Sequence, residues 1–440
     1  VLEGMHLATK RDVYARLFAF WLKIFAVAFG LGVVSGIVMA FQFGSNWSEL
    51  SRRTGPIQGP LLAYESFTAF ALEASFFGVL IFGRNRVPPA LYLASAILVA
   101  VGTSLSSFWI LVNNSWMQWP TGFGQMRDGI FEPTSWTNII FNGVVWVRFP
   151  HMILAAYVTT AFCVAATGAW HLLRGKHREE SLAMLRMGLG LASVLVPAQI
   201  LFGHLNGDYV VDKQPSKIAA IEGHWEDQQP AGEILFAIPD EAGEKNWLQI
   251  SLPPPFGSLI DSSSFTAKEI GLKSIPREDR PPVLIPFFAF RIMVGIAMIM
   301  LALAWGGSWL AWKKQLHLRR WFLWPVFCSF PLGFVATLTG WITAEVGRQP
   351  WTVYGQLRTV DAVTPTLRVG EVAASLAVFG SVYALIFLFG AIYIYRLLRA
   401  GPAPVGGTPV GAANAKRPLA VPGGSPHPSG GQSPHPAAAE

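Results

Sequence analysis

The chain has 440 residues, of which 52% are hydrophobic and only 13% are charged, with a net charge of +7. Soluble domains usually carry about 25% charged residues, so this composition argues against a soluble protein. Two cysteines are too few for a disulfide scaffold or a zinc cluster. The apolar residues lie in long blocks, which is typical of an integral membrane protein.

Several apolar segments are long enough to cross the hydrocarbon core, which needs about 20 helical residues. In chain order they are residues 18–41, 61–82, 90–112, 149–172, 184–205, 283–312, 321–344 and 371–397. No repeat of 20–50 residues is evident, which argues against a solenoid. The sequence therefore predicts an all-α bundle of eight transmembrane helices.

Basic residues follow a pattern along these segments. If every segment crosses, one side of the membrane receives most of them: Lys10, Arg11, Arg16, Arg84, Arg86, Arg174, Lys176, Arg178, Lys313, Lys314, Arg319, Arg320, Arg396 and Arg399. The positive-inside effect assigns this side to the cytoplasm. It also accounts for the net charge, so we expect no nucleic-acid partner. The polar stretch 206–282 would then lie on the outer side.

Two polar stretches interrupt or follow the apolar segments. Residues 206–282 are too long for a turn, contain Trp225 and Trp247, and are expected to be functional. Residues 401–440 are mostly Gly, Pro, Ala and Ser, and we expect a disordered cytoplasmic tail without a catalytic role. The predicted organisation is one membrane domain, 1–398, followed by this tail.

Ionisable side chains within the predicted spans mark candidate functional positions, because they are costly in hydrocarbon. Glu65 and Glu73 lie in the second span, about 80° apart on a regular α-helix, so both can face one bundle interior. His151 begins the fourth span and Glu345 ends the seventh. Taken alone, His151 could be a hydrogen-bonded structural histidine, and Glu345 could cap a helix.

The sixth span carries Arg291 and Met293. Arg291 could extend toward the interface, and Met293 could simply fill the core. Histidine and methionine are also a common axial pair for haem iron, and an arginine near the methionine could pair with a haem propionate. No CxxCH motif is present, so any haem would be held non-covalently. These residues favour a membrane redox protein.

Six motifs occur in the same order as in one family of membrane oxidases. They are FQFGSNWSELS from Phe41, GPLLAYESFTAFALEASFFGVLIFG from Gly59, SLSSFWILVNNSWMQWPTGF from Ser104, SKIAAIEGHWE from Ser216, PFFAFRIMVG from Pro286 and GWITAEVGRQPWTVYG from Gly340. The last is close to the signature GWxxxExGRQPW. Over residues 1–398 the chain resembles subunit I of the cytochrome bd-type ubiquinol oxidases, of which the cyanide-insensitive quinol oxidase subunit I is a close variant.

The resemblance implies ligands for three haems. His151 and Met293 fall on the axial ligands of the low-spin haem b558, and Glu345 falls on the ligand of the high-spin haem b595. Glu65 falls on the glutamate at the O2 site, which holds haem d or a second haem b.

Other positions carry further roles implied by the resemblance. Glu73 and Ser106 fall where the family leads protons to the O2 site. Residues 206–282 correspond to the quinol-binding Q loop, in its short form. Arg291, Trp341 and Arg348 fall on residues that the family packs around the haems. Lys273 resembles a lysine implicated in quinol oxidation.

The implied function is that of a haem-containing catalytic subunit of a terminal respiratory oxidase. It would oxidise quinol and reduce O2 to water, building a proton gradient by charge separation without pumping. Its partners would be subunit II in a heterodimer, a small single-span subunit and the lipid of a bacterial cytoplasmic (inner) membrane. A haem-free membrane transporter or assembly subunit is the alternative, and haem bands in the visible spectrum would distinguish the two.

The N-terminus is where the chain departs from the family pattern. The family has nine spans, and the first carries a histidine that ligates a high-spin haem. The sequence that begins at Val1 is similar to the segment just after that helix, and His6 does not match its histidine. The expectation is therefore an N-terminally truncated form.

Overall fold

The computed structural model describes residues 1–230, 232–253 and 268–402. Within these residues, 8 helical stretches are long and apolar enough to cross a membrane. They are α2 (Asp12–Ala40), α4 (Ser48–Tyr64) continued by the π-helix η1 (Glu65–Phe70) and α5 (Ala71–Phe82), α6 (Pro89–Gln118), α8 (Val145–Leu173), α9 (Arg178–Lys213), α12 (Leu284–Trp312), α13 (Arg320–Cys328) with α14 (Leu332–Val346), and α15 (Val369–Ala400). The predicted all-α membrane fold is confirmed.

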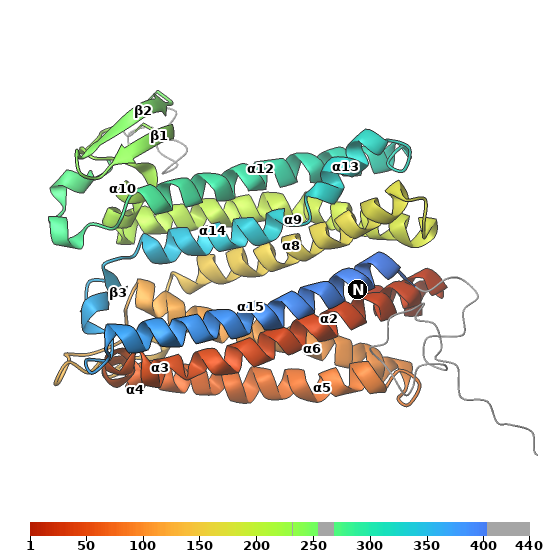
Figure 1. Ribbon diagram of the computed structural model, residues 1–440, viewed down its shortest axis with the longest axis horizontal. Coiled ribbons are helices and arrows are strands. Elements are labelled where there is room, and N and C mark those ends of the chain that lie inside the picture. Colours follow the sequence, from red (N-terminus) through yellow and green to blue (C-terminus); the bar gives the residue numbers. More distant parts are fainter. Residues whose placement is uncertain (231, 254–267, 403–440) are drawn as a thin grey trace, which may run out of the picture.

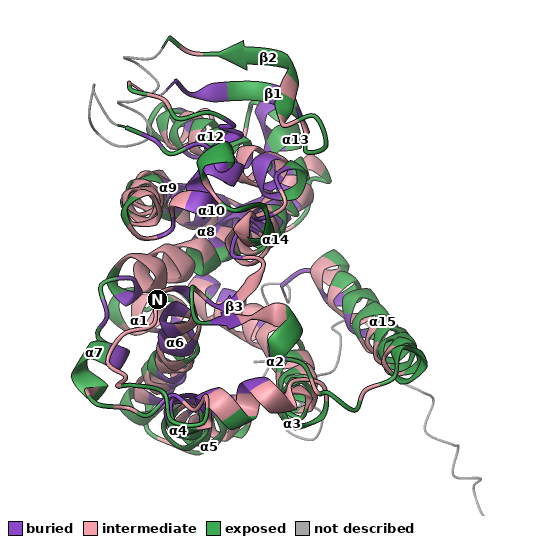
Figure 2. Cartoon of the chain, turned by 90° about the vertical axis from the view of Figure 1, so that its left-hand side faces the viewer, coloured by how far each residue is buried: buried purple, intermediate pink, exposed green. Residues whose placement is uncertain are grey.

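The long helices run side by side in two groups (Figure 1). The α8–α14 group comprises α8, α9, α12, α13 and α14, and its core includes Phe162, Leu185 and Met300. The α2–α6 group comprises α2, α4, η1, α5 and α6, together with the short α3 (Gln42–Ser45). Figure 2 shows α15 standing to one side; it packs mainly on α2, and His171 of α8 contacts the Leu398 carbonyl near its end at 3.0 Å. Helix α6 also packs on α8, so it joins the two groups.

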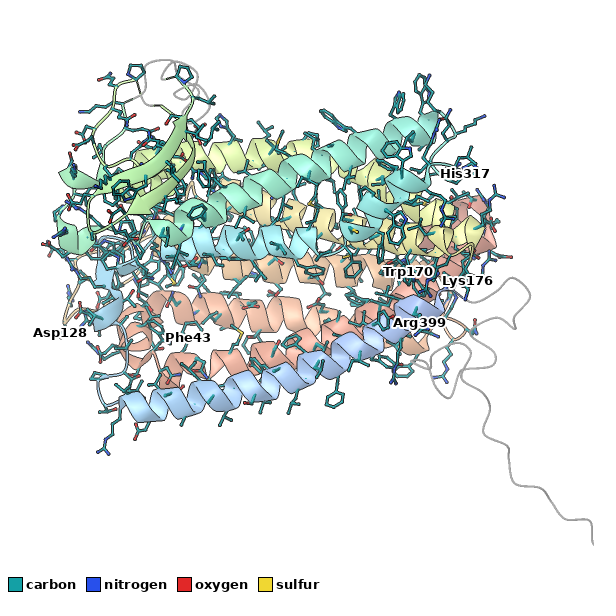
Figure 3. All side chains as sticks on the ribbon, turned by 45° about the horizontal axis from the view of Figure 1, so that its top comes forward. Phe43, Asp128, Trp170, Lys176, His317 and Arg399 are labelled. Atoms are coloured by element: carbon teal, nitrogen blue, oxygen red, sulfur yellow. The ribbon has the colours of Figure 1, made fainter. Side chains whose placement is uncertain are left out.

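The labelled side chains of Figure 3 mark the two ends of the bundle. Figure 3 shows Lys176, His317 and Arg399 at one end, and Phe43 and Asp128 at the other. The short helices α1 (Leu2–Thr9) and α7 (Trp136–Ile140) lie at the ends of the spans. Two of the basic residues that were predicted to share one side, Lys176 and Arg399, lie at the same end of the bundle.

The second span is not a regular helix. α4 begins at Ser48, well before the predicted start at residue 61, and it contains Pro56 and Pro60. These prolines and the polar residues before them hid the first half of the helix, because the segment is not continuously apolar. The six residues of η1 then form a π-helix. The angle of about 80° between Glu65 and Glu73 assumed a regular α-helix, and that assumption is wrong.

The seventh span was predicted to be continuous over residues 321–344, and it is broken. α13 ends at Cys328, and α14 begins at Leu332, directly after Pro331. Proline disfavours the helical conformation at the residue before it and cannot donate a backbone hydrogen bond. Apolarity alone did not reveal this break, since Phe330 and Pro331 do not interrupt the apolar block.

The predicted loop 206–282 is largely folded in its described part. Its first residues belong to α9, which continues to Lys213. The buried helix α10 (Pro215–Glu222) follows, and then the antiparallel strands β1 (Ile234–Asp240) and β2 (Lys245–Ser251). His224 Nδ1 lies 2.7 Å from Glu269 Oε2, and both side chains are buried. We call residues 214–253 and 268–282 the cap.

A second, shorter hairpin joins the seventh and eighth spans. It consists of β3 (Trp351–Val353) and β4 (Leu357–Arg358), and it contacts α6. The backbone N–H of Tyr354 donates to the Met117 carbonyl at 2.9 Å. This hairpin therefore anchors the end of α14 to the end of α6. The predicted disordered tail, beyond its first two residues, lies outside the described residues.

Candidate functional site

Glu65 and Glu73 both face α6, although they come from different helical segments. Ser106 Oγ donates to Glu65 Oε1 at 3.1 Å, and the Thr103 hydroxyl donates to Glu73. Glu73 is buried, whereas Glu65 is half-buried. One turn beyond Ser106, the indole N–H of Trp109 is buried without a hydrogen-bond partner in the described structure. Three predicted residues, Glu65, Glu73 and Ser106, are thus brought together.

Glu345, at the end of α14, lies in a cationic setting. Its carboxylate accepts from Asn114 Nδ2 at 3.1 Å and from Gln118 Nε2 at 3.2 Å, both on α6. It also pairs with Arg348, and Arg148 Nη2 lies 3.9 Å away. Two guanidinium groups therefore surround one carboxylate, and the predicted residues Glu345 and Arg348 are in direct contact.

Helix α6 supplies polar partners to all three carboxylates. These partners lie between Thr103 and Gln118, a stretch that spans about 22 Å at 1.5 Å per residue. In order along α6 come the contacts to Glu73, to Glu65 and to Glu345. Helix α6 therefore supplies hydrogen-bond donors, one after another along its length, to carboxylates from two other spans.

A cavity of about 520 Å³ lies within the α8–α14 group and under α10. His151, Met293 and Trp341 line it, from α8, α12 and α14. His151 Nε2 lies 3.2 Å from the side-chain nitrogen of Gln199, and its Nδ1 is buried without a partner among the described residues. The structure thus brings the predicted axial pair, from two different helices, to one cavity.

Part of the cavity wall carries nitrogen donors. Arg148 and Lys217 line it, and Lys217 Nζ donates to Gln118 Oε1 at 3.0 Å. Burial, and then the nearby guanidinium of Arg148, hold the pKa of Lys217 well below its usual range. Three buried guanidinium N–H groups have no hydrogen-bond partner in the described structure. They are Nη1 of Arg148, and Nε and Nη1 of Arg348. Unpaired buried donors are costly, so this region suits an anionic group.

Glu222, contributed by α10, is a buried carboxyl at the cavity. Burial, and then the neighbouring Glu233, raise its pKa to about 8. Arg291 Nη2 lies 3.4 Å from Glu222 and 3.7 Å from Glu233, and Arg291 Nη1 donates to the Ile221 carbonyl at 2.8 Å. Arg291 was expected beside a haem; in this structure its donors bind the cap to α12.

Lys273 lies apart from the cavity. Its side chain is 39% exposed and pairs with Glu226 on the surface of the cap. Lys217 and Glu222 lie at the cavity instead, and the sequence analysis did not single them out. The available signal was the segment SKIAAIEGHWE, in which Lys217 and Glu222 flank the apolar run IAAI.

These features define a class of protein: an integral membrane oxidoreductase with candidate haem ligands in its helices and buried donors for anionic groups. The family model for cytochrome bd terminal oxidase subunit I matches residues 1–402. The chain belongs to this family of terminal oxidase subunits. The predicted family, enzyme class and use of haem are confirmed, and as a subunit I the protein works with other subunits.

Individual relatives cover most of the chain. Cytochrome bd ubiquinol oxidase subunit 1 of Bacillus subtilis (strain 168) is 36% identical over 417 residues, which cover 91% of this chain and 86% of that protein. Cytochrome bd-II ubiquinol oxidase subunit 1 of Escherichia coli (strain K12) is 30% identical, covering 92% and 91%. The solved bd oxidase from Geobacillus thermodenitrificans gives a TM-score of 0.81 at 27% identity, covering 91% of each chain.

Proposed function

We propose that this subunit oxidises quinol at its cap and takes part in the reduction of O2 to water within its helices. The observation that carries the proposal is the cavity under α10. It is lined by the candidate axial pair, His151 and Met293, and also by two buried titratable groups of the cap, Lys217 and Glu222. A redox cofactor and its electron donor would therefore share one cavity.

The resemblance to the family implies three haem positions in this chain. His151 and Met293 would hold the low-spin haem b558, Glu345 would ligate haem b595, and Glu65 would serve the O2-site haem, either haem d or a second haem b. When bound, haem supplies the one-electron and O2 chemistry. The orphaned N–H groups of Arg148 support this reading, because guanidinium pairs well with carboxylates such as haem propionates. The unpartnered N–H groups of Arg348 could pair with a propionate in the same way. Trp341 lines the cavity and would pack against the haem.

At the cap, Glu222 would accept a proton from quinol. A base works best when its pKa is close to the working pH, and the pKa of Glu222 is about 8. Lys217 would orient the substrate through its N–H donors. The role of Lys273 in quinol oxidation remains a prediction from the resemblance, without support from its exposed position.

Protons for water would reach the O2 site along α6. Glu73 and Ser106 were predicted for this role, and Thr103 hydrogen-bonds to Glu73 one turn before Ser106. We place this entry on the cytoplasmic side and the cap on the periplasmic side of the inner membrane. Quinol protons released outside and water protons taken from inside would then separate charge without pumping.

Subunit II, as a heterodimer partner, would cover the exposed apolar faces of α2 and α15. On α15 these include Leu376 and Phe389, which are 63% and 67% exposed. A small single-span subunit would be an accessory. We expect the O2-site haem to be lost when the subunit is expressed alone and restored by co-expression with subunit II. A fully active oxidase without any partner would contradict this.

The central experiment is Met293→Leu in the oxidase purified from its membrane. Leucine keeps the volume but cannot ligate iron, so the low-spin haem should become high-spin or lose reduction potential while the other haems persist. Visible spectra recorded during a redox titration measure both. An unchanged low-spin spectrum and potential would remove the ligand assignment. The family match favours the oxidase over the haem-free transporter or assembly alternative.

A further inference from the structure

Two glycines lie against the candidate axial ligands. Gly340 on α14 faces Met293, and a Cβ built on Gly340 would lie 2.9 Å from the Met293 sulfur. Gly203 on α9 faces His151, and a Cβ there would lie 3.2 Å from His151 Cε1 and 3.7 Å from its Nδ1. A side chain at either glycine would therefore come into close contact with the candidate ligand next to it.

We propose that Gly340 is a positioning residue for the sulfur of Met293, and that Gly203 acts in the same way, more weakly, on the ring of His151. The inference rests on the proposed assignment of Met293 and His151 as axial ligands. Because Gly340 lacks a side chain, the Met293 sulfur can lie close against α14. A methyl group at position 340 would push the sulfur away from α14 and change where it can reach in the cavity.

The contact at Gly340 differs from the contacts of a helix-packing glycine. Gly333, on the same helix, would place its Cβ 2.5 Å from Thr159 Oγ1 and 2.7 Å from the Thr159 backbone Cα, so α14 and α8 would have to separate. At Gly340 the neighbouring atom is near the end of a flexible side chain. Alanine at position 340 should therefore leave the helices in place and move the sulfur.

The contact at Gly203 should respond less. A separation of 3.2 Å is tight but requires a shift of only a few tenths of an ångström. The imidazole ring is rigid, so the whole ring of His151 would tilt rather than one atom moving. We expect a smaller spectral change from Gly203→Ala than from Gly340→Ala.

The test is Gly340→Ala in the assembled oxidase, with Gly295→Ala as the matched control. Gly295 lies on α12, two residues beyond Met293, is exposed, and has nothing within 4 Å of its added Cβ. Both changes introduce the better helix former, so helix propensity cannot explain a difference. We expect Gly340→Ala to reduce or abolish the low-spin haem signal and Gly295→Ala to retain it. Equal, unchanged spectra in both variants would overturn the inference.

Met293→Leu separates this inference from the ligand assignment. If Met293→Leu alters the low-spin spectrum and Gly340→Ala does not, only the positioning role fails. If Met293→Leu has no effect, the assignment fails and the positioning role fails with it.

A double variant covers the case in which Gly340→Ala does not assemble. Met293→Ala removes the sulfur that the new methyl group would meet. Gly340→Ala should therefore cause no further loss of assembled, haem-containing oxidase in the Met293→Ala background. A further loss there would show that position 340 acts through helix packing, and it would overturn the proposal.

Discussion

The two helix groups hold their carboxylates in opposite ways. In the α8–α14 group, Glu345 is surrounded by guanidinium and amide donors, with Arg348 and Arg148 on one side and α6 on the other. In the α2–α6 group, Glu65 and Glu73 have hydroxyl partners, Ser106 and Thr103. All three carboxylates accept a hydrogen bond from a residue of α6, so the difference between them lies in the chemical type of the donors around them.

The difference indicates what each carboxylate can do. A guanidinium only donates, and it keeps a nearby carboxylate charged and fixed in place. A hydroxyl both donates and accepts, so it can receive a proton on one side and release one on the other. Glu345 is therefore suited to a permanent structural or ligating charge, and Glu65 and Glu73 are suited to proton exchange.

The largest expected effect comes from removing Glu345. Glu345→Ala would leave Arg148, Arg348 and Lys217 buried without their carboxylate. Removing one partner of a fully buried ion pair costs about 3–5 kcal/mol, and the cost here should be smaller because the Glu345 side chain is 31% exposed. We expect little assembled oxidase and a lower thermal transition. Glu226→Ala, which removes an exposed partner, is the control and should assemble normally. Equal yields from the two variants would show that the cationic cluster needs no counter-charge.

Glu73→Gln tests the role of a carboxylate that has a hydroxyl partner. Glutamine keeps the shape and the contact with Thr103 but cannot carry a proton. If Glu73 relays protons, O2 consumption should fall by about 100-fold, because proton transfer by a positioned group contributes at least that much. Haem content should be largely retained, and quinol should still reduce the haems. Normal O2 consumption would leave Glu73 with a packing role only.

Glu65→Gln should behave differently from Glu73→Gln. Glu65 is the residue assigned to the O2 site, and Trp109 with its unpaired indole N–H lies one turn beyond its partner Ser106. We expect the spectrum of the O2-site haem itself to change. If both glutamine variants lose turnover with unchanged spectra, the two carboxylates act as one relay, and the distinction between them fails.

A pH profile sharpens the role of Glu222. Its pKa is raised to about 8, mainly by burial, so its base form becomes populated as pH rises through that value. If the base form accepts the quinol proton, quinol oxidation should increase as pH rises through about 8 and level off above it, and Glu222→Gln should remove this increase. Steady-state rates of quinol oxidation, measured from about pH 6 to about pH 9 so that they bracket the pKa of Glu222, test this expectation. A rise that survives in Glu222→Gln must come from another group.

Sequence patterns predicted the fold well where apolarity decides it. The eight spans were found because each is a long apolar block, and the ligand candidates were found because polar side chains in such blocks are conspicuous. The π-helix at Glu65–Phe70 and the break before Leu332 were missed. Both depend on backbone hydrogen bonding around proline or within the helix, which average hydropathy does not describe.

The cap was the least predictable part of the site. Lys217 and Glu222 lie outside every predicted span, where charged residues are ordinary, so nothing marked them as buried. Their position depends on contacts between α10, α6 and α12 that are distant in sequence. The resemblance pointed instead to Lys273, which is exposed. In a polar loop, residue type alone could not separate the two lysines.

The smallest expected effect, and the sharpest choice between the two lysines, comes from Lys273→Met compared with Lys217→Met. Lys273 makes one exposed ion pair with Glu226, and such pairs contribute no more than about 1 kcal/mol. Its loss should leave the KM for quinol and the thermal transition nearly unchanged. Lys217→Met would leave the side-chain oxygens of Gln118 and Gln214 without the Nζ donor at the cavity, and it should raise the KM for quinol. The reverse result, a raised KM in Lys273→Met alone, would mean that quinol binds on the outer surface of the cap. The exposed lysine would then be the functional one, and the cavity under α10 would serve only to hold haem.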